Sequence, residues 1–130
     1  MIEVSVVIPT KNRAGYIGRA LKSVYDQTIT NIEIIVVDDG SNDNTEEIIN
    51  IHKLNEKVPI RFIKNEKSVG GAVARNQGAK IAKGRYIAFL DSDDQWLPEH
   101  LEKGLFLLKE KKCHGIYGSF FIEKADGIRR

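Results

Sequence analysis

The chain has 130 residues, of which 42% are hydrophobic and 29% charged, and its formal net charge is +2. This composition is typical of one compact globular domain, and the nearly balanced charge argues against nucleic acid or an anionic membrane surface as the partner. A single cysteine, Cys113, excludes an internal disulfide. Because no signal peptide and no bilayer-length apolar run is visible, we expect a cytoplasmic protein without a membrane span.

The first half of the chain predicts two strands and two helices. Residues 4–9 and 32–37 are almost wholly apolar and β-branched, as expected of strands buried on both faces of a parallel sheet. Between them, apolar residues recur at helical spacing over residues 16–24. N-cap residues and first-turn acids in residues 41–47 predict the start of a second helix, which we expect to include Leu54.

The alternation continues in the second half of the chain. Residues 60–63 are predicted to form a third strand. The alanine-rich stretch 70–83 is predicted to be a third helix, which Gly84 would end as the C′ glycine. Residues 86–90 follow as a fourth predicted strand.

A fourth helix and a last strand complete the prediction. Pro98 lies where the first turn of a helix tolerates proline, and residues 115–122 have the composition of a strand. The alternation of strands and helices predicts an α/β fold, a doubly wound and mostly parallel sheet with helices on both faces. Ligands of such sheets bind at the carboxyl ends of the strands.

Polar clusters follow three of the predicted strands. Thr-Lys-Asn-Arg at 10–13 follows the first, Asp38 and Asp39 follow the second, and Asp-Ser-Asp-Asp at 91–94 follows the fourth. Parallel strands end at the same edge of a sheet, so these clusters should lie near one another. The sequence therefore predicts a site built from carboxylates and basic side chains at this edge.

Three carboxylates crowd the third cluster: Asp91, Asp93 and Asp94. Like charges at this range repel by about 1 kcal/mol per pair in water, so the fold needs a partner for them. A calcium loop is excluded because its sixth position would be Trp96 instead of glycine. Capping of the following helix stays open as an alternative, but we favour Mg²⁺ or Mn²⁺, which bind carboxylates together with substrate phosphates.

Two further motifs each allow a structural and a functional interpretation. Asp38 and Asp39 are either turn and cap residues, or one of them accepts a hydrogen bond from a base or a sugar hydroxyl. The Ser-Val-Gly-Gly stretch at 68–71 precedes a helix, and its backbone N–H groups are a weak candidate for a phosphate cradle. His52 and His100 lack metal-ligand spacing, and we expect both at the surface.

Taken together, these motifs resemble the N-terminal, nucleotide-sugar-binding part of a family 2 glycosyltransferase with the GT-A fold. Four blocks carry the likeness in order over nearly the whole chain: residues 4–13, 33–45, 70–78 and 84–94. The resemblance implies a metal-dependent, inverting transfer of a sugar from a nucleotide diphosphate, expected to be a UDP-sugar, to an acceptor hydroxyl. The acceptor would be a carbohydrate or a lipid-linked molecule, and the protein would work in the cytoplasm or at the inner face of the membrane.

The resemblance also implies roles at the sheet edge. The end of the first strand and Asp39 would contact the base, two arginines would lie near the diphosphate, and Asp91 would contact the ribose or the donor sugar. Asp93 would hold the divalent cation. The expected donor-binding residues are Pro9, Thr10, Arg13, Asp39, Arg75, Asp91 and Ser92.

The family's catalytic base and acceptor-binding segments lie beyond this acidic motif, and the base is not recognisable in the chain. We therefore expect residues 1–130 to be a single nucleotide-sugar-binding domain, truncated at the C-terminus and covering the donor-binding half of an enzyme. A non-catalytic nucleotide-sugar-binding module is the alternative. A signalling receiver domain has a similar order of elements, but it needs an acidic pair after the first strand, where this chain has Lys11-Asn12-Arg13.

Overall fold

The computed structural model describes residues 1–111, in which strands and helices alternate from β1 to α4. The strands are β1 (Val4–Thr10), β2 (Ile32–Asp38), β3 (Ile60–Lys64) and β4 (Tyr86–Phe89). The helices are α1 (Ile17–Tyr25), α2 (Thr45–His52), α3 (Gly71–Ile81) and α4 (His100–Lys111). Cys113 and the predicted strand over 115–122 lie outside the described residues.

The four strands form one parallel sheet in the order β3-β2-β1-β4. The central strands β1 and β2 pair along their whole length, from Val4 opposite Ile32 to Thr10 opposite Asp38. Both are buried over nearly every residue, as the sequence predicts for strands covered on both faces. The register brings the polar residues that end the two strands side by side, which prepares a site at this edge.

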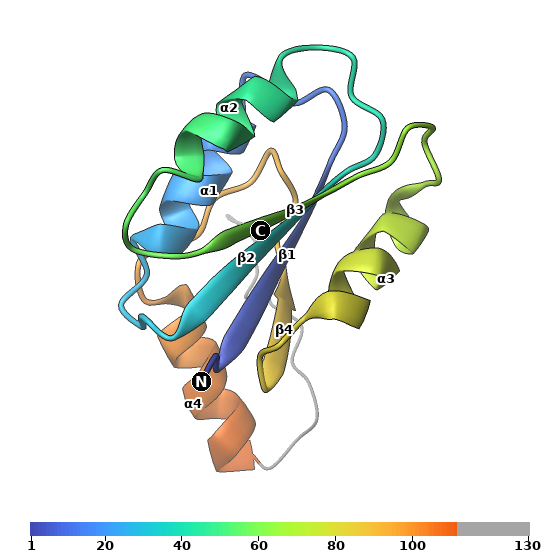
Figure 1. Ribbon diagram of the computed structural model, residues 1–130. Helices are drawn as coiled ribbons and strands as arrows, with labels where there is room; N and C mark the ends of the chain where they lie inside the picture. The colour runs from blue at the N-terminus through green and yellow to red at the C-terminus, as the bar shows by residue number, and fades with distance from the viewer. Residues whose placement is uncertain (112–130) are drawn as a thin grey trace. The chain divides into compact units, whose positions relative to one another are not determined.

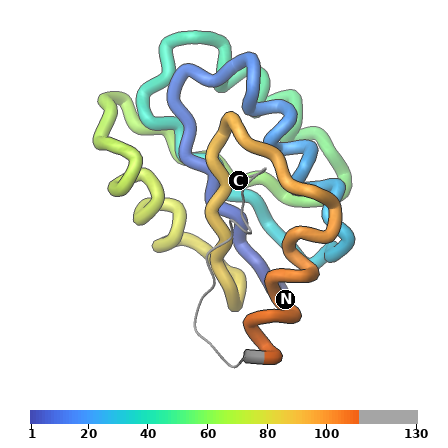
Figure 2. Tube along the Cα trace, turned by 180° about the vertical axis from the view of Figure 1, so that it is seen from behind, coloured from blue at the N-terminus to red at the C-terminus, as the bar shows by residue number. Residues whose placement is uncertain are grey.

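Helices cover both faces of this sheet (Figure 1). α1 and α2 pack against each other on one face, and α3 packs against β1 and β2 on the other. Figure 2 shows the same arrangement from behind. The close approach of α3 depends on Gly78, where an added Cβ would lie 2.4 Å from Cγ1 of Val7. The prediction of a parallel α/β fold with helices on both faces is confirmed.

The chain divides into two compact units. The first comprises Met1–Asp26 and Thr30–Trp96 and contains the sheet with α1, α2 and α3. The second comprises Gln27–Ile29 and the chain from Leu97 onward, with α4. Within the second unit, the Gln27 side chain donates to the carbonyl of Leu97 at 2.7 Å and accepts from the N–H of Leu101 at 2.9 Å. One side chain therefore satisfies backbone groups before and within the first turn of α4.

The predicted C′ role of Gly84 is wrong. α3 already ends at Ile81, where Ala82 turns to an extended conformation, and Gly84 is not among the glycines with positive φ. Its lack of a side chain serves packing instead, because a Cβ there would lie 2.6 Å from the backbone nitrogen of Ser5. Gly84 therefore lets the segment before β4 approach the backbone of β1.

Other helix ends and the histidines also differ from the predictions. α2 ends at His52, so Leu54 lies outside the helix and is 80% exposed. α4 begins at His100, after Pro98. The two histidines are partly buried instead of lying at the surface: the Tyr25 hydroxyl lies 2.7 Å from His52 Nδ1, and burial lowers the pKa of His52 and brings the pKa of His100 down to about 4.

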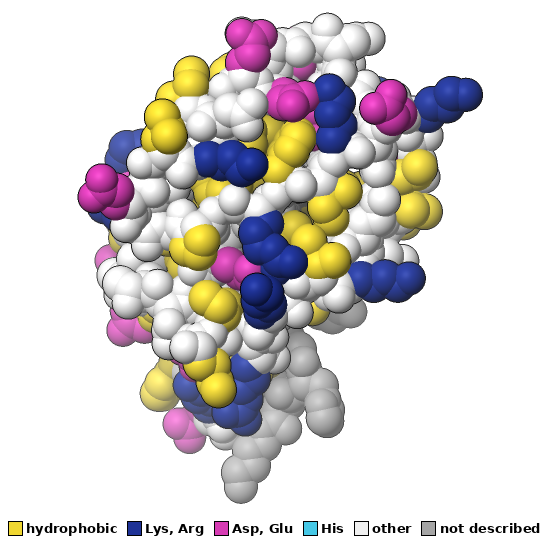
Figure 3. All heavy atoms as spheres, viewed as in Figure 1, with side chains coloured by type: hydrophobic (Ala, Val, Ile, Leu, Met, Phe, Trp, Pro, Cys, Tyr) yellow, Lys and Arg dark blue, Asp and Glu magenta, His cyan; other side chains and the backbone are white. Residues whose placement is uncertain are grey.

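The surface carries a mixture of side-chain types. On the face drawn in Figure 3, acidic and basic side chains of the described residues are interspersed with apolar ones. This agrees with the small formal charge of the chain. No helix among residues 1–111 combines the length and the apolar character needed to cross a membrane.

Candidate functional site

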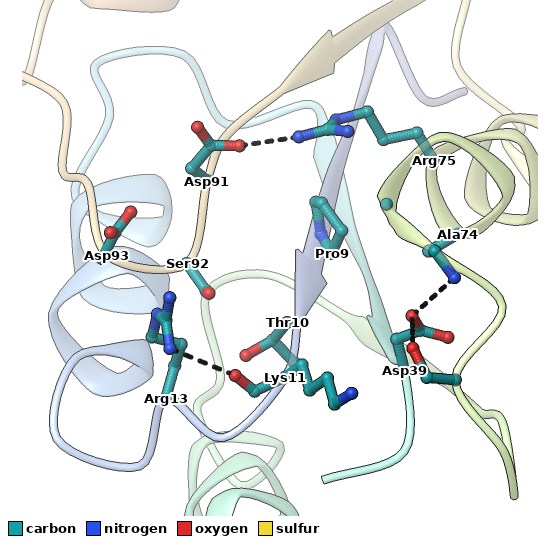
Figure 4. A pocket seen from close by; sticks show the side chains of 13 residues that line it. Pro9, Thr10, Lys11, Arg13, Asp39, Ala74, Arg75, Asp91, Ser92 and Asp93 are labelled. Atoms are coloured by element: carbon teal, nitrogen blue, oxygen red, sulfur yellow. Dashed lines mark hydrogen bonds and ion pairs between the residues drawn. The ribbon is translucent and has the colours of Figure 1, made fainter.

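An open cavity of about 400 Å³ lies at the carboxyl edge of the sheet, within the first unit. It is bordered by the end of β1, the segments that follow β2 and β4, and the start of α3 (Figure 4). All eight residues expected to bind the donor or the cation line it: Pro9, Thr10, Arg13, Asp39, Arg75, Asp91, Ser92 and Asp93. The remaining lining residues are Lys11, Ser68, Gly70, Gly71 and Ala74.

The carboxylates occupy two separate ends of this cavity. Asp39 follows β2 and faces the start of α3, whereas Asp91 and Asp93 follow β4 (Figure 4). Pro9 and Thr10 lie between them because β1 separates β2 from β4 in the sheet. The cavity can therefore hold an elongated ligand that meets a different carboxylate environment at each end.

Asp91 and Asp93 form the acidic end of the cavity, and Asp94 belongs to the same cluster of carboxylates. One carboxylate oxygen from each lies within 4.8 Å of the others, and all three residues are exposed. The segment is a tight turn in which the N–H of Asp94 donates to the carbonyl of Asp91 at 3.0 Å. Arg75 Nη2 lies 3.1 Å from Asp91 Oδ1 and offsets part of the charge.

This donor set fits a hard divalent cation. Mg²⁺ and Mn²⁺ prefer oxygen ligands and use one or two carboxylates plus substrate phosphates, and Asp91 and Asp93 both line the cavity where a ligand would lie. The alternative role as helix caps loses its support, because α4 begins only at His100. Of the three acids, Asp94 does not line the cavity.

Four donors surround the carboxylate of Asp39, which is only 5% exposed. Its Oδ1 accepts from the N–H of Val69 at 2.8 Å and from Asn65 Nδ2 at 3.1 Å. Its Oδ2 accepts from Ser68 Oγ at 2.7 Å and from the N–H of Gly70 at 3.0 Å. Burial works to raise the pKa of Asp39, but these hydrogen bonds outweigh it and lower the pKa to about 2.

Two consequences follow for the sequence predictions. Asp39 is ionised at neutral pH and acts only as an acceptor. The sequence also suggested that backbone N–H groups of residues 68–71 bind a phosphate. This prediction is wrong for Val69 and Gly70, because their N–H groups already donate to Asp39.

Of Asp38 and Asp39, for which the sequence allowed either a turn role or a ligand-binding role, Asp38 has the turn role. It is fully buried, and its Oδ1 accepts from the N–H of Ser41 at 2.9 Å, which makes it a turn residue. Among the described residues, two buried polar side-chain atoms lack a hydrogen-bond partner, Asp38 Oδ2 and Thr10 Oγ1. Thr10 itself lines the cavity, although its hydroxyl oxygen is buried.

Two neighbouring loops hold the basic side of the cavity. The loops that follow β1 and β2 run side by side in Figures 1 and 2, joined by hydrogen bonds from Asn12 N–H to Ser41 Oγ at 2.8 Å and from Arg13 N–H to Thr45 Oγ1 at 3.2 Å. Asn12 has a φ of +53°, a left-handed conformation that asparagine tolerates better than most residues. This junction fixes the backbone from which Lys11 and Arg13 reach the cavity.

Sequence reasoning missed a pair of amides behind Asp39. Asn65 and Gln77 hydrogen-bond reciprocally, with Asn65 Nδ2 donating to Gln77 Oε1 at 2.8 Å and Gln77 Nε2 donating to Asn65 Oδ1 at 2.9 Å. Asn65 follows β3, and Gln77 lies within α3. No pattern in the sequence links these positions, because the contact exists only once α3 packs on the sheet.

Sequence comparison relates the chain to known glycosyltransferases. The sequence profile described as Glycosyl transferase family 2 matches residues 5–129. The UDP-Glc:alpha-D-GlcNAc-diphosphoundecaprenol beta-1,3-glucosyltransferase WfaP of Escherichia coli is 43% identical over 121 residues, which are 93% of this chain and 47% of that protein. The chain spans about half the length of the curated relatives it matches first.

Solved structures show the same similarity in three dimensions. Residues 1–349 of Staphylococcus aureus TarS, in complex with UDP-GlcNAc, match with a TM-score of 0.76 and 33% identity over 84% of this chain and 32% of that chain. The mannosyltransferase PcManGT of Pyrobaculum calidifontis, in complex with GDP-Man and Mn²⁺, matches with a TM-score of 0.77 and 25% identity over 82% of this chain and 32% of that chain. With a family profile matched from residue 5 to residue 129, the chain belongs to glycosyl transferase family 2 and has the GT-A fold.

Proposed function

We propose that residues 1–130 are the donor-binding part of an inverting glycosyltransferase that uses a UDP-sugar together with Mg²⁺ or Mn²⁺. The observation that carries the proposal is the cavity at the sheet edge, which places a buried, hydrogen-bonded Asp39 at one end and the acidic residues Asp91 and Asp93 at the other. The complexes of TarS with UDP and UDP-GlcNAc support a uridine nucleotide as the ligand.

Each part of the cavity suits one part of such a donor. The Asp39 end offers an anionic acceptor for the N–H of a base, and Pro9 and Thr10 line the cavity between the two ends. Arg13 and Arg75 supply positive charge for a diphosphate. Asp93 with Asp91 would hold the divalent cation, which when bound would neutralise charge on the departing nucleoside diphosphate.

The proposed reaction is a single displacement at the anomeric carbon of the donor sugar. The acceptor hydroxyl oxygen forms the new bond to that carbon, while the bond from the carbon to the phosphate oxygen breaks and its electron pair leaves with UDP. The hydroxyl proton passes to a carboxylate base, and attack opposite the leaving group inverts the configuration. The family resemblance puts this base beyond the acidic motif, so none of the described residues is assigned to it.

The acceptor and the place of the reaction are further parts of the proposal. The E. coli relative is named for a diphosphoundecaprenol-linked acceptor, which supports a lipid-linked or carbohydrate acceptor for this protein. An acceptor of that kind would place the reaction in the cytoplasm, at the inner face of the membrane. A non-catalytic nucleotide-sugar-binding module is the second candidate, and donor binding without donor hydrolysis or sugar transfer would distinguish it from the enzyme.

Calorimetry with UDP tests donor binding. Residues 1–130 are titrated with UDP in the presence of Mn²⁺, of Mg²⁺ and of EDTA. We expect tighter binding with either cation than with EDTA, because Asp91 and Asp93 repel a diphosphate unless a cation lies between them. Equal affinity with and without the cation would contradict metal binding, and the absence of any UDP binding would contradict the donor site itself.

A further inference from the structure

We propose that the donors around Asp39 form a cage with a single exchangeable position, Ser68, and that this cage selects a base with one N–H group at its edge, uracil, over guanine. Asn65 and Gln77 act as positioning residues that keep the carboxylate in place during the exchange. The inference rests on the proposed function, because it assumes that a nucleotide base binds at Asp39.

The carboxylate of Asp39 has a limited number of acceptor sites. A carboxylate offers about four lone-pair positions. In Asp39 these meet four donors, from Asn65, Ser68, Val69 and Gly70. A base can therefore donate to Asp39 only in exchange for one of the donors already present.

Of the four donors to Asp39, Ser68 is the one that a base can replace. Two donors are backbone N–H groups of Val69 and Gly70, which lead into α3, and the carbonyl of Gly70 accepts the N–H of Ala74 at 3.0 Å. Displacing either N–H group would require the backbone before α3 to move. Ser68 instead donates through a hydroxyl that rotates about one bond, and it is exposed at the cavity wall, where water can take over its hydrogen bond.

The fourth donor to Asp39 is the side-chain amide of Asn65. Its amide is held by both hydrogen bonds to Gln77, and its backbone N–H donates to the carbonyl of Asp38 at 2.8 Å. The Asn65 side chain therefore cannot turn away from Asp39 without breaking both hydrogen bonds to Gln77. It keeps Oδ1 of Asp39 fixed while Oδ2 exchanges Ser68 for the ligand.

The consequence is a choice between bases. Uracil has one N–H group in its pairing edge, at N3, which needs one acceptor position. Guanine presents N1–H and the N2 amino group side by side and needs both carboxylate oxygens, but Oδ1 is held by Asn65 and Val69. The cage thus accepts one ligand N–H and leaves a guanine amino group without its acceptor, which is costly at a buried site.

The experiment compares UDP with its N3-methyl analogue, which lacks this N–H group, and with GDP, all titrated calorimetrically in Mn²⁺. For the unmodified protein we expect N3-methylation to weaken binding about ten- to a hundredfold, the range of a hydrogen bond to a charged group, and GDP to bind at least about tenfold more weakly than UDP. UDP binding without any penalty for N3-methylation, or equal affinity for GDP, would overturn the cage while leaving the donor site standing.

Three variants test the individual roles. Gln77→Met keeps the length of the side chain but frees Asn65, so the penalty for N3-methylation should shrink to below about threefold while N3-methyl-UDP binds as before. An unchanged penalty, or equal weakening of both ligands, would show that Gln77 does not position Asp39. Lys80→Met introduces the same methionine side chain at an exposed position of α3. This variant is the matched control and should keep the full penalty for N3-methylation.

Ser68→Ala removes the competing hydroxyl at an exposed position, and circular dichroism checks that the variant is folded. UDP should bind this variant severalfold more tightly than the unmodified protein, because no hydroxyl then competes for Oδ2 of Asp39, and the N3-methylation penalty should be retained. Loss of the penalty in Ser68→Ala would overturn the exchange, because it would mean that Ser68 has to stay on Asp39 for the base to bind.

Discussion

At the residue scale, Asp39 and Asp93 show that one side-chain type occupies two different environments in one cavity. Asp39 is 5% exposed, and the hydrogen bonds that hold it ionised also fix its orientation. Asp93 is exposed and lies beside two further carboxylates, so its negative charge is least compensated without a cation. The first is suited to orienting a neutral, hydrogen-bonding base and the second to holding a metal ion.

This contrast predicts different effects of two substitutions. Asp39→Ala should weaken binding of uridine and of UDP about ten- to a hundredfold with or without a cation, because it removes a charged hydrogen-bond acceptor. Asp93→Ala should weaken only the cation-dependent part of UDP binding and leave uridine unaffected. Calorimetry with both ligands in Mn²⁺ and in EDTA measures this, with circular dichroism as the control for folding. The site assignment is wrong if neither substitution changes the affinity.

At the scale of the elements, a second polar network holds the strands together away from the cavity. Glu33 of β2 is 2% exposed, and its Oε2 accepts from Ser5 Oγ of β1 at 2.6 Å and from the N–H of Lys83 at 2.8 Å. Its Oε1 accepts from Arg61 Nη1 of β3 at 3.2 Å. The hydroxyl of Ser5 also accepts from the N–H of Gly84 at 2.8 Å, so one buried carboxylate links three strands to the segment before β4.

The network predicts a pH-dependent contribution of Glu33 to stability. Burial works to raise the pKa of Glu33, but the hydrogen bonds from Ser5, Lys83 and Arg61 prevail and the pKa is lowered from its ordinary 4.5. A carboxylate whose pKa is lower in the folded than in the unfolded protein stabilises the folded state. This contribution is fully present at a pH above the unfolded-state pKa, and it is lost as the pH falls through the folded-state pKa. Glu33→Gln should therefore lower the free energy of unfolding at pH 7 by about 1.5–3 kcal/mol, and by less below pH 4.5.

Urea unfolding of both proteins from pH 7 down to pH 3.5 measures this difference. The lowered pKa values of His52 and His100 also reduce stability as the pH falls below 6.5, but they do so in both proteins and cancel in the comparison. Glu46→Gln is the control, because its ion pair with Lys64 is exposed and contributes at most about 1 kcal/mol. A difference between wild type and Glu33→Gln that stays constant with pH would contradict the assignment.

At the scale of the whole molecule, the described part contains the features expected of a donor site and no assigned catalytic base. The cavity, the Asp39 cage and the acidic cluster all lie in the first compact unit. The chain spans about half the length of the first two curated relatives.

We predict that residues 1–130 bind UDP but transfer sugar poorly. Loss of a general base costs about 10² to 10⁴ in rate, and loss of acceptor positioning costs more. UDP release with a panel of lipid-linked and carbohydrate acceptors measures transfer, and full-length E. coli WfaP serves as the positive control for the assay. Transfer at a rate near that of the control would contradict this prediction and would make a carboxylate within the chain, with Asp94 the nearest candidate, the base.

Sequence reasoning reached the parts of this structure that depend on local pattern. The uninterrupted apolar runs of β1 and β2 indicated strands buried on both faces, and their alternation with helices indicated a parallel sheet. Since parallel strands end at one edge, the polar residues that follow them had to converge there, and all eight predicted residues line one cavity. Helix ends were less predictable: α3 stops at Ile81 although the sequence suggested that it would run on to Gly84.

By itself, the sequence determined the order of the elements, the parallel sheet and the edge at which the site forms, because each follows from hydrophobic period and strand direction. The packed structure was needed to show that Asp38 closes a turn, that Asn65 and Gln77 hydrogen-bond behind Asp39, and that Gly84 makes room for β1. These features are hydrogen bonds and close approaches between segments far apart in the chain. Such contacts form only when α3 and the strand ends have packed, so no local spacing of residues encodes them.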